Sequence, residues 1–236
     1  MKSKLFITFA TLVFLSNVNY AQVADNKDFA MWNSVGIKYS PIKKLKLGVE
    51  QHIRLKENAS ETDEYFTEVF AGFEIIKDLE IGGAARFIRE NDNVGKIQGY
   101  EKHFRYNVDL TYKLDNINKF DISFRLRYQN KRELELEEGV EDIAAENLRL
   151  KMGIEYNIKS WPLDPEFALE LFNRKRDGLS FIGDAKISRY RLTFGTSYNL
   201  KKFGKFGIYY RYQENTRVDN TFVTEIFGLK YTYSIN

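Results

Sequence analysis

The chain has 236 residues, a net charge of +3 from 36 basic and 33 acidic side chains, 15% aromatic residues and no cysteine. The absence of cysteine excludes disulfides, thiol catalysis and thiolate metal sites. Charges that nearly cancel are not the signature of a nucleic-acid-binding protein, so we expect no nucleic-acid partner.

Residues 1–21 have the features of a secretory signal peptide. Lys2 opens a basic start, Leu5 to Leu15 form an apolar segment, and Tyr20-Ala21-Gln22 supplies a cleavage site. A membrane-spanning helix is the alternative, but the apolar run has about 11 residues where such a helix needs about 20. We therefore predict that the signal peptide is removed and that residues 22–236 form a single domain.

From Phe29 onward, apolar and polar residues alternate in segments of about 10 to 15 residues, the length with which a tilted strand crosses a bilayer. The first predicted strand is opened by Trp32, and the later ones include 45–55, 103–112, 120–129, 147–157, 167–172, 188–198, 206–212 and 223–233. The clearest is Phe120–Gln129, where every even position is apolar or aromatic and every odd one polar. Helical spacing is not sustained anywhere, which predicts an all-β chain.

The predicted connections alternate in length. Short turns are expected at 41–43, 77–78, 115–118, 161–163 and 201–204, and longer polar loops at 56–63, 91–99, 133–141, 177–184 and 215–220. Outer-membrane barrels have short periplasmic turns and longer outer loops, whereas a soluble barrel would turn its apolar face inward. We therefore predict a transmembrane antiparallel up-and-down β-barrel in the outer membrane of a Gram-negative bacterium, with a polar lumen.

The number of strands is the uncertain part of this architecture. Eleven strand signals are present, although bacterial single-chain barrels normally have an even number. With a periplasmic carboxyl end, the Trp32 strand would run downward, and residues 22–28 would have to cross back. We therefore expect 10 to 12 strands.

Several segments resemble a family of uncharacterised outer-membrane barrels, the domain of unknown function 2490. They are Trp32, Val49–Leu55, His103–Asn107, Phe124–Gln129 and Phe227–Tyr231. The resemblance covers essentially the whole mature chain. It implies the location and the fold, and it brings no established activity.

Charged side chains on the inward face are the candidate functional residues. They are Glu50, His52, Arg54, Arg86, His103, Arg105, Asp109, Asp121, Arg125, Arg127, Arg149, Lys151, Glu155, Glu170, Arg174, Arg189, Arg191 and Arg211. Basic residues outnumber acidic ones, and a positively lined narrow pore would favour anions. The alternative is a plug-like network of arginine–carboxylate pairs that fills a small barrel, and we favour the network over an open channel.

A membrane-embedded lipid-modifying hydrolase is the alternative function. It would need a serine beside His52 or His103 on the lipid side, but both histidines fall on the inward face without a persuasive triad partner. A rim protease that uses histidine and the acidic residues Asp63, Glu64, Asp92 and 133–138 near the outer mouth is disfavoured against a hydrated loop, because short acidic runs are common and these lack the ligand spacing for calcium. We therefore predict no catalytic or metal site and no cofactor.

Tyrosines near the predicted strand ends are expected to form girdles at the membrane interface. They are Tyr39, Tyr112, Tyr128, Tyr156, Tyr198, Tyr212, Tyr231 and Tyr233. The predicted partners are outer-membrane lipid and an undefined small solute, and the oligomeric state is left open. The expected role is structural, binding or limited small-solute transport.

Overall fold

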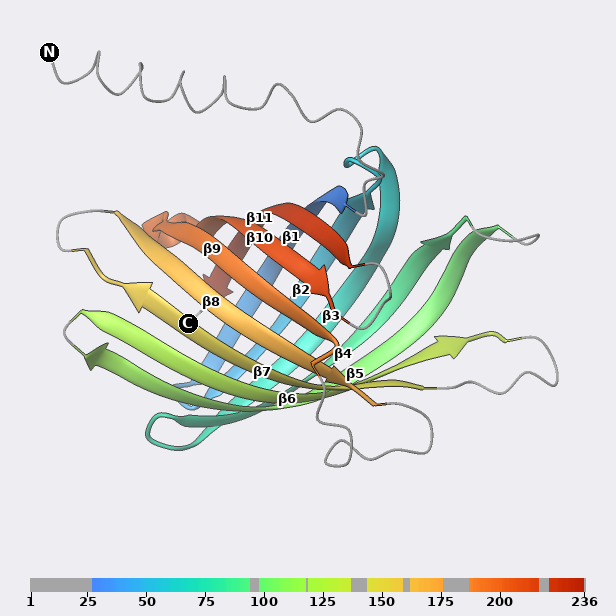
Figure 1. Cartoon of the computed structure of the whole chain (residues 1–236). Coiled ribbons are helices and arrows are strands. Elements are labelled where there is room, and N and C mark those ends of the chain that lie inside the picture. Colours follow the sequence, from blue (N-terminus) through green and yellow to red (C-terminus); the bar gives the residue numbers. More distant parts are fainter. Residues whose placement is uncertain are drawn as a thin grey trace, which may run out of the picture.

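The computed structural model describes residues 27–93, 98–117, 119–136, 144–158, 162–175, 187–216 and 221–235. These residues form eleven strands that follow one another around a closed barrel (Figure 1). The strands are β1 (Lys27–Ile42), β2 (Leu45–Lys56), β3 (Glu61–Ile76), β4 (Leu79–Asp92), β5 (Gly99–Ile117), β6 (Phe120–Leu134), β7 (Ala145–Tyr156), β8 (Leu163–Arg174), β9 (Arg189–Asn199), β10 (Lys205–Asn215) and β11 (Phe222–Ile235). The predicted all-β barrel is confirmed, and the predicted signal peptide lies outside the described residues.

Alternating side chains give the barrel wall two different faces. On β6, Phe124 and Leu126 point outward and are 40% and 45% exposed, while Arg125 and Arg127 line the interior. Successive side chains of a strand point to opposite faces of the sheet. The period of two in the sequence therefore becomes an apolar outer surface around a charged lumen.

Aromatic rings border the outer apolar belt. On β6 the belt extends from Phe120, beside a short turn, to Tyr128, and the exposed Arg132 follows on the same face. Rings on adjacent strands contact each other, with centroids 4.8 Å apart for Phe120 and Tyr156 and 6.3 Å apart for Tyr106 and Tyr128. Amphipathic rings favour the membrane interface, so this arrangement is that of two aromatic girdles.

A small polar group interrupts the apolar belt on β1, β2 and β3. The hydroxyl of Thr67 donates a hydrogen bond to Oε1 of Gln51 at 2.6 Å, and these two residues are directly opposed on the outer face. Asn33 and Gln51 border a shallow outer groove of 500 Å³ together with apolar side chains such as Ile53 and Leu229. Three neighbouring strands thus carry amide or hydroxyl groups at mid-height on the outer surface.

An odd number of strands requires one parallel pair, and this pair closes the barrel. β1 and β11 are parallel over thirteen register positions, from Lys27 beside Val223 to Tyr39 beside Ile235. The other neighbouring strands pair antiparallel. The first strand therefore runs in the same direction as the last, as the sequence indicated, and the described residues contain no twelfth strand.

The parallel seam is covered from the inside by Tyr209. Its ring lies across Gly228 of β11, where an added Cβ would be only 2.0 Å from the ring, so only glycine fits. The Tyr209 hydroxyl reaches further and donates to the main-chain oxygen of Trp32 on β1 at 3.3 Å. This one side chain thereby connects β10, β11 and β1 where the barrel closes.

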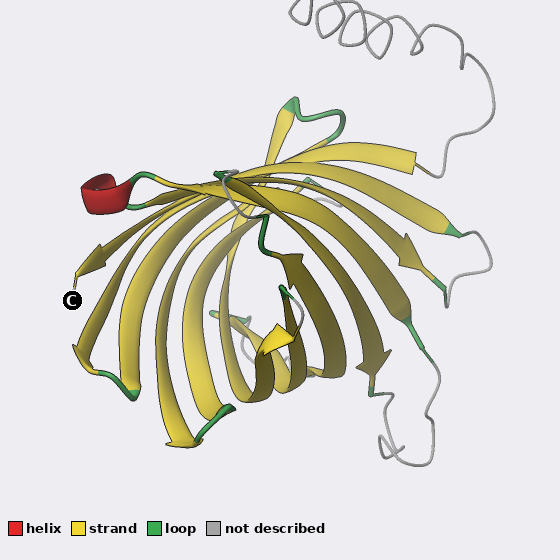
Figure 2. Ribbon diagram, turned by 90° about the vertical axis from the view of Figure 1, so that its left-hand side faces the viewer, coloured by secondary structure: helices red, strands yellow, loops and turns green. Residues whose placement is uncertain are grey.

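The connections follow the predicted sorting, with one correction. Short turns lie at one rim, where the 3-10 turn η1 (Lys201–Phe203, red in Figure 2) also lies, close to the end of β11. No helix formed by the described residues is long and apolar enough to span a bilayer. The predicted loop 56–63 is instead a four-residue turn, 57–60, in which three successive residues have positive φ. The carboxylate of Asp28 accepts hydrogen bonds from the main-chain nitrogens of Glu57 and Asn58, which holds this turn against β1.

Candidate functional site: the charged lumen

The barrel encloses a main cavity of 690 Å³. Fourteen of the predicted lumen residues line it: Glu50, His52, Arg54, Arg86, Arg105, Arg125, Arg127, Arg149, Lys151, Glu170, Arg174, Arg189, Arg191 and Arg211. Asp109 lines a second cavity of 270 Å³ nearer the short-turn rim. His103, Asp121 and Glu155 border neither of these two cavities.

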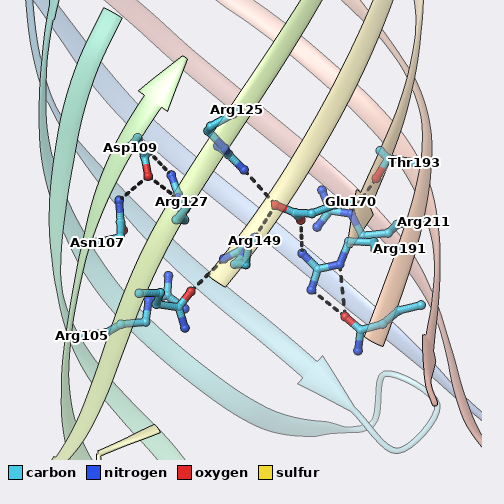
Figure 3. Close-up of polar contacts among 12 residues, drawn as sticks. Arg105, Asn107, Asp109, Arg125, Arg127, Arg149, Glu170, Arg191, Thr193 and Arg211 are labelled. Carbon is cyan, nitrogen blue, oxygen red and sulfur yellow. Dashed lines mark hydrogen bonds and ion pairs between the residues drawn. The ribbon is translucent and has the colours of Figure 1, made fainter. Parts of the chain in front are cut away.

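Glu170 of β8 is the centre of an ion-pair cluster with three arginines (Figure 3). Its Oε1 accepts from Arg125 at 3.0 Å and from Arg149 at 2.8 Å, and its Oε2 accepts from Arg191 at 3.2 Å. The carboxylate is 5% exposed. One buried anion therefore holds three guanidinium groups that come from β6, β7 and β9.

A second cluster joins β5 and β6. Arg127 donates two hydrogen bonds to the Asp109 carboxylate, at 2.6 and 2.5 Å, which is the bidentate geometry of a strong charge-assisted pair. Asn107 donates to the same carboxylate at 3.2 Å. Asp121 and Glu155 are two further carboxylates of the predicted arginine–carboxylate network. Asp121 accepts a hydrogen bond from Asn157 at 2.9 Å, close to the short-turn rim.

Inward-facing aromatic rings support the arginines. The guanidinium of Arg54 lies 3.7 Å from the ring centroid of Trp32, Arg86 lies 4.2 Å from that of Phe66, and Arg149 lies 4.5 Å from the third ring, Phe172. Such stacking is favourable for a planar cation. Phe66 and Phe172 are 1% and 6% exposed. These three inward-facing rings thus provide apolar packing surfaces for the arginines of the lumen.

The two cavities meet at a layer of paired charges. Both are lined by Glu50, Glu68, Arg127 and Lys230. Lys230 of β11 donates to Glu50 of β2 at 2.7 Å, across the intervening β1. Below this layer, Glu80 accepts from Lys46 at 2.5 Å and from Lys113 at 3.1 Å. Ion pairs therefore lie between the two cavities at about the level of Glu50.

Both histidines face carboxylates. Nε2 of His52 is 3.1 Å from Glu50, and Nε2 of His103 is 3.2 Å from Glu101 and 3.4 Å from Glu90. The contacts of the described residues include no hydroxyl hydrogen-bonded to either imidazole. Neither histidine is thus placed as the base of a serine nucleophile.

Each histidine also belongs to a cluster that could offer three ligand atoms to a metal ion. The clusters are Glu50, His52 and Glu68, and Glu101, His103 and Glu133, with ligand atoms within 4.8 Å of one another. In the first cluster, Lys230 already pairs with Glu50 and Arg86 with Glu68. Resident cations beside these carboxylates oppose binding of a metal cation.

The family described as "Protein of unknown function (DUF2490)" matches residues 29–223 of the chain. The chain belongs to this family. The predicted resemblance is thereby confirmed. A comparison with curated proteins gives no significant match.

Two solved barrels are similar to this family member. One is the β domain of the Bordetella autotransporter BrkA, at 12% identity and a TM-score of 0.47 over 76% of this chain and 79% of that one. The other is the NanC porin, at 13% identity and a TM-score of 0.47 over 78% of this chain and 86% of that one.

Several residues that line the lumen were not among the predicted inward-facing residues. They are Trp32, Glu64, Phe66, Glu68, Gln129, Lys131, Tyr209, Gln213 and Lys230. On β3 the alternation is obscured because Phe66 and Phe70 point inward, next to outward Tyr65 and Val69. Pairing β3 with the clear alternation of β2 would have placed Glu64 and Glu68 inside, since Arg54 opposes Glu64 and Glu50 opposes Glu68.

Proposed function

We propose that this protein is exported and resides in the outer membrane as an embedded barrel. Its outer belt of apolar side chains, bordered by aromatic rings, fits hydrocarbon between two interfaces. The strands have 11 to 19 residues, enough for the about 9 to 11 that a tilted strand needs to cross. Removal of residues 1–21 as a signal peptide belongs to the same proposal.

The proposed role of the lumen is to admit small anionic solutes. The observation that carries this proposal is the charge of the main cavity, which is lined by ten arginines and three lysines but only six acidic residues. The acidic side chains are all engaged in ion pairs with lumen cations or with Lys56. The unbalanced charge is therefore positive, and it favours anions inside the barrel.

The paired layer makes the proposed passage narrow. Arg127 with Asp109 and Lys230 with Glu50 lie between the two cavities, so a solute meets fixed pairs before it reaches the short-turn rim. The proposal combines the two predicted alternatives, because it assigns the plug-like network to the paired layer and anion entry to the main cavity. We therefore expect conductance steps of small amplitude, slow passage of solutes and a preference for anions.

Conductance of the refolded protein in a planar bilayer tests this proposal. In a KCl gradient we expect small steps whose reversal potential shows preference for chloride. Lys151→Glu should weaken the preference, because Lys151 lines the cavity, while the same change at Lys44, in the turn between β1 and β2, should not. Cation preference, or no conductance at all, would contradict the proposed role.

The hydrolase alternative is tested on the same preparation. We propose that the protein is not an enzyme, because His52 and His103 contact carboxylates inside the lumen rather than a hydroxyl at the lipid face. Phospholipid vesicles that contain the refolded barrel should therefore release no more fatty acid than vesicles without it. Release that is abolished by His52→Gln or His103→Gln would reverse this assignment.

A further inference from the structure

Arg105 occupies an unusual position in the barrel wall. In the register of β4, β5 and β6 it stands directly between two other cations, Arg86 and Lys131. Like charges that face each other across strands are destabilising unless an anion lies between them. The question is therefore which group balances this row of three cations.

The carboxylates near the row are already engaged. Glu68 accepts a hydrogen bond from Nε of Arg86, and Glu90 accepts one from Lys131. Glu68 comes no closer to Arg105 than 3.8 Å, between Oε2 and Nη2. Arg105 thus has an ion pair with Glu68 but is the member of the row without a hydrogen bond to a carboxylate among the described residues.

The side chain of Arg105 is also buried without hydrogen bonds on one edge. The residue is 8% exposed, and its Nε and Nη2 atoms have no acceptor among the described residues. A buried donor normally has a partner, because leaving one unpaired is costly, most of all for a charged group. Nη1 of Arg86, directly across the strand, lacks an acceptor as well.

We propose that Arg105 and Arg86 form a binding site for the oxyanion group of a solute, a phosphate or a carboxylate. Nε and Nη2 form one edge of the planar guanidinium, and two oxygens of a single oxyanion match that edge. Both arginines line the 690 Å³ cavity, which has room for the rest of the solute. The unpaired atoms are shielded from solvent, so an oxyanion reaches them only when neighbouring side chains move.

This site rests on the proposed function, since it assumes that anionic solutes enter the lumen, and it adds a selectivity for oxyanions over chloride. Chloride satisfies the charge of a guanidinium but cannot accept along two parallel N–H bonds as a carboxylate does. The barrel should therefore bind phosphate or acetate saturably at an ionic strength at which chloride has no specific effect.

Thermal unfolding of the refolded full chain in detergent tests the site without requiring conduction. Titration with sodium phosphate or sodium acetate, each against sodium chloride at equal ionic strength, should raise the unfolding temperature saturably, because a ligand that binds only the folded state stabilises it. A saturable rise with phosphate alone would identify a site for a tetrahedral dianion. A saturable rise with both phosphate and acetate would identify a general oxyanion site. No saturable shift with either anion would refute the proposal.

Variants at Arg105 locate the effect. Arg105→Gln should weaken the binding about tenfold or more, and Arg105→Lys should weaken it too, because lysine keeps the charge but lacks the two-pronged edge. Neither variant strands a carboxylate, since Glu68 keeps Arg86, so both should fold. Arg132→Gln, an exposed arginine on the outer face of β6, is the matched control and should bind as the unmodified protein does.

The outcomes separate the two proposals. A barrel that binds phosphate through Arg105 but passes no ions keeps the site and refutes the transport role. An anion-selective conductance without saturable binding keeps the transport role and refutes the site. Equal loss of binding in Arg105→Gln and Arg132→Gln would show a diffuse charge effect and would also refute the site.

Discussion

The two faces of the same strands treat charge in opposite ways. On β6, Arg125 and Arg127 face the lumen and each contacts a carboxylate, while Phe124 and Leu126 alternate with them, face outward and have no charged neighbour directly opposite. The two pairs of positions differ by one residue along the chain. The difference between them is that a charged partner or water can reach a side chain in the lumen but not one on the apolar outer face.

Charged side chains inside the lumen are stabilised by their ion-pair partners, whereas the outer belt is stable because nearly all of its side chains are apolar. A buried charge costs little only while its partner is present. An apolar side chain in the outer belt needs no partner, but a charge placed there has none to find. The comparison therefore predicts loss of stability for removal of charge on one face and for addition of charge on the other.

Loss of the lumen hub should have the largest effect. Glu170→Ala removes the carboxylate that Arg125, Arg149 and Arg191 share, and two buried guanidinium groups and the half-buried one of Arg125 then compete for other acceptors. We expect the free energy of unfolding to fall by about 3 to 5 kcal/mol, as when one partner of a buried ion pair is removed. Denaturant titration of the refolded barrel in lipid vesicles measures this change.

Glu80 provides the matched control for the hub. It also joins two cations, Lys46 and Lys113, but the three side chains are 21%, 35% and 36% exposed. Partly exposed pairs contribute about 0 to 1 kcal/mol, so Glu80→Ala should change stability little. Equal effects at Glu170 and Glu80 would mean that the whole lumen is wet and that burial does not distinguish its two cavities.

Addition of charge on the outer face should have the next largest effect. Phe124 lies midway between the aromatic borders Phe120 and Tyr128 of its strand. Phe124→Arg should destabilise the barrel by about 2 to 4 kcal/mol, the cost of arginine near the bilayer midplane. Refolding titrations in lipid vesicles would show it.

The position on the same face at the end of the belt separates depth from side-chain loss. Phe120 is exposed to the same extent as Phe124, 40%, but it lies at the short-turn rim. Phe120→Arg should cost less, because a charge near the interface costs only about 0 to 1 kcal/mol apart from the lost ring contact. If Phe124→Arg were harmless, the outer face would not be in contact with lipid.

The alternation that underlies these predictions was readable from the sequence because it repeats. Segments such as 120–129 set the two faces without ambiguity, and the sorting of turns and loops set the strand order. The parallel closure was harder to predict, because pairing of the first and last strands depends on residues far apart in the sequence. Nothing local to Gly228 shows that Tyr209 will cover it.

The partners of individual lumen charges were not predictable in the same way. Alternation places Arg125 inside, but its partner Glu170 lies two strands away, and a pattern within one strand cannot show contacts across the lumen. Asp121 illustrates this limit. It was predicted as a carboxylate of the arginine network, and it lies near the short-turn rim, where it accepts a hydrogen bond from Asn157. Inward aromatic residues such as Phe66 added a second difficulty, because an aromatic residue in the sequence pattern predicts a lipid-facing position.

Removal of the polar group from the outer belt should have the smallest effect and the opposite sign. Gln51 and Thr67 are opposed on the outer faces of β2 and β3 and satisfy each other only in part. Replacing one alone would deprive the other of this hydrogen bond in hydrocarbon, which is unfavourable, although Gln51 Nε2 also donates to the main-chain oxygen of His52 at 3.5 Å. Gln51→Leu combined with Thr67→Val removes both, and we expect a gain of about 1 kcal/mol in the same titrations.

The single variants complete this test of the outer face. Gln51→Leu and Thr67→Val should each be less stable than the double variant, because the pair acts as a unit. A double variant that is less stable than the unmodified barrel would contradict the expected gain, because it would show that the hydrogen-bonded pair stabilises the barrel wall more than apolar side chains do. The outer face would then resemble the lumen, since polar groups on both faces would stabilise the barrel through their partners.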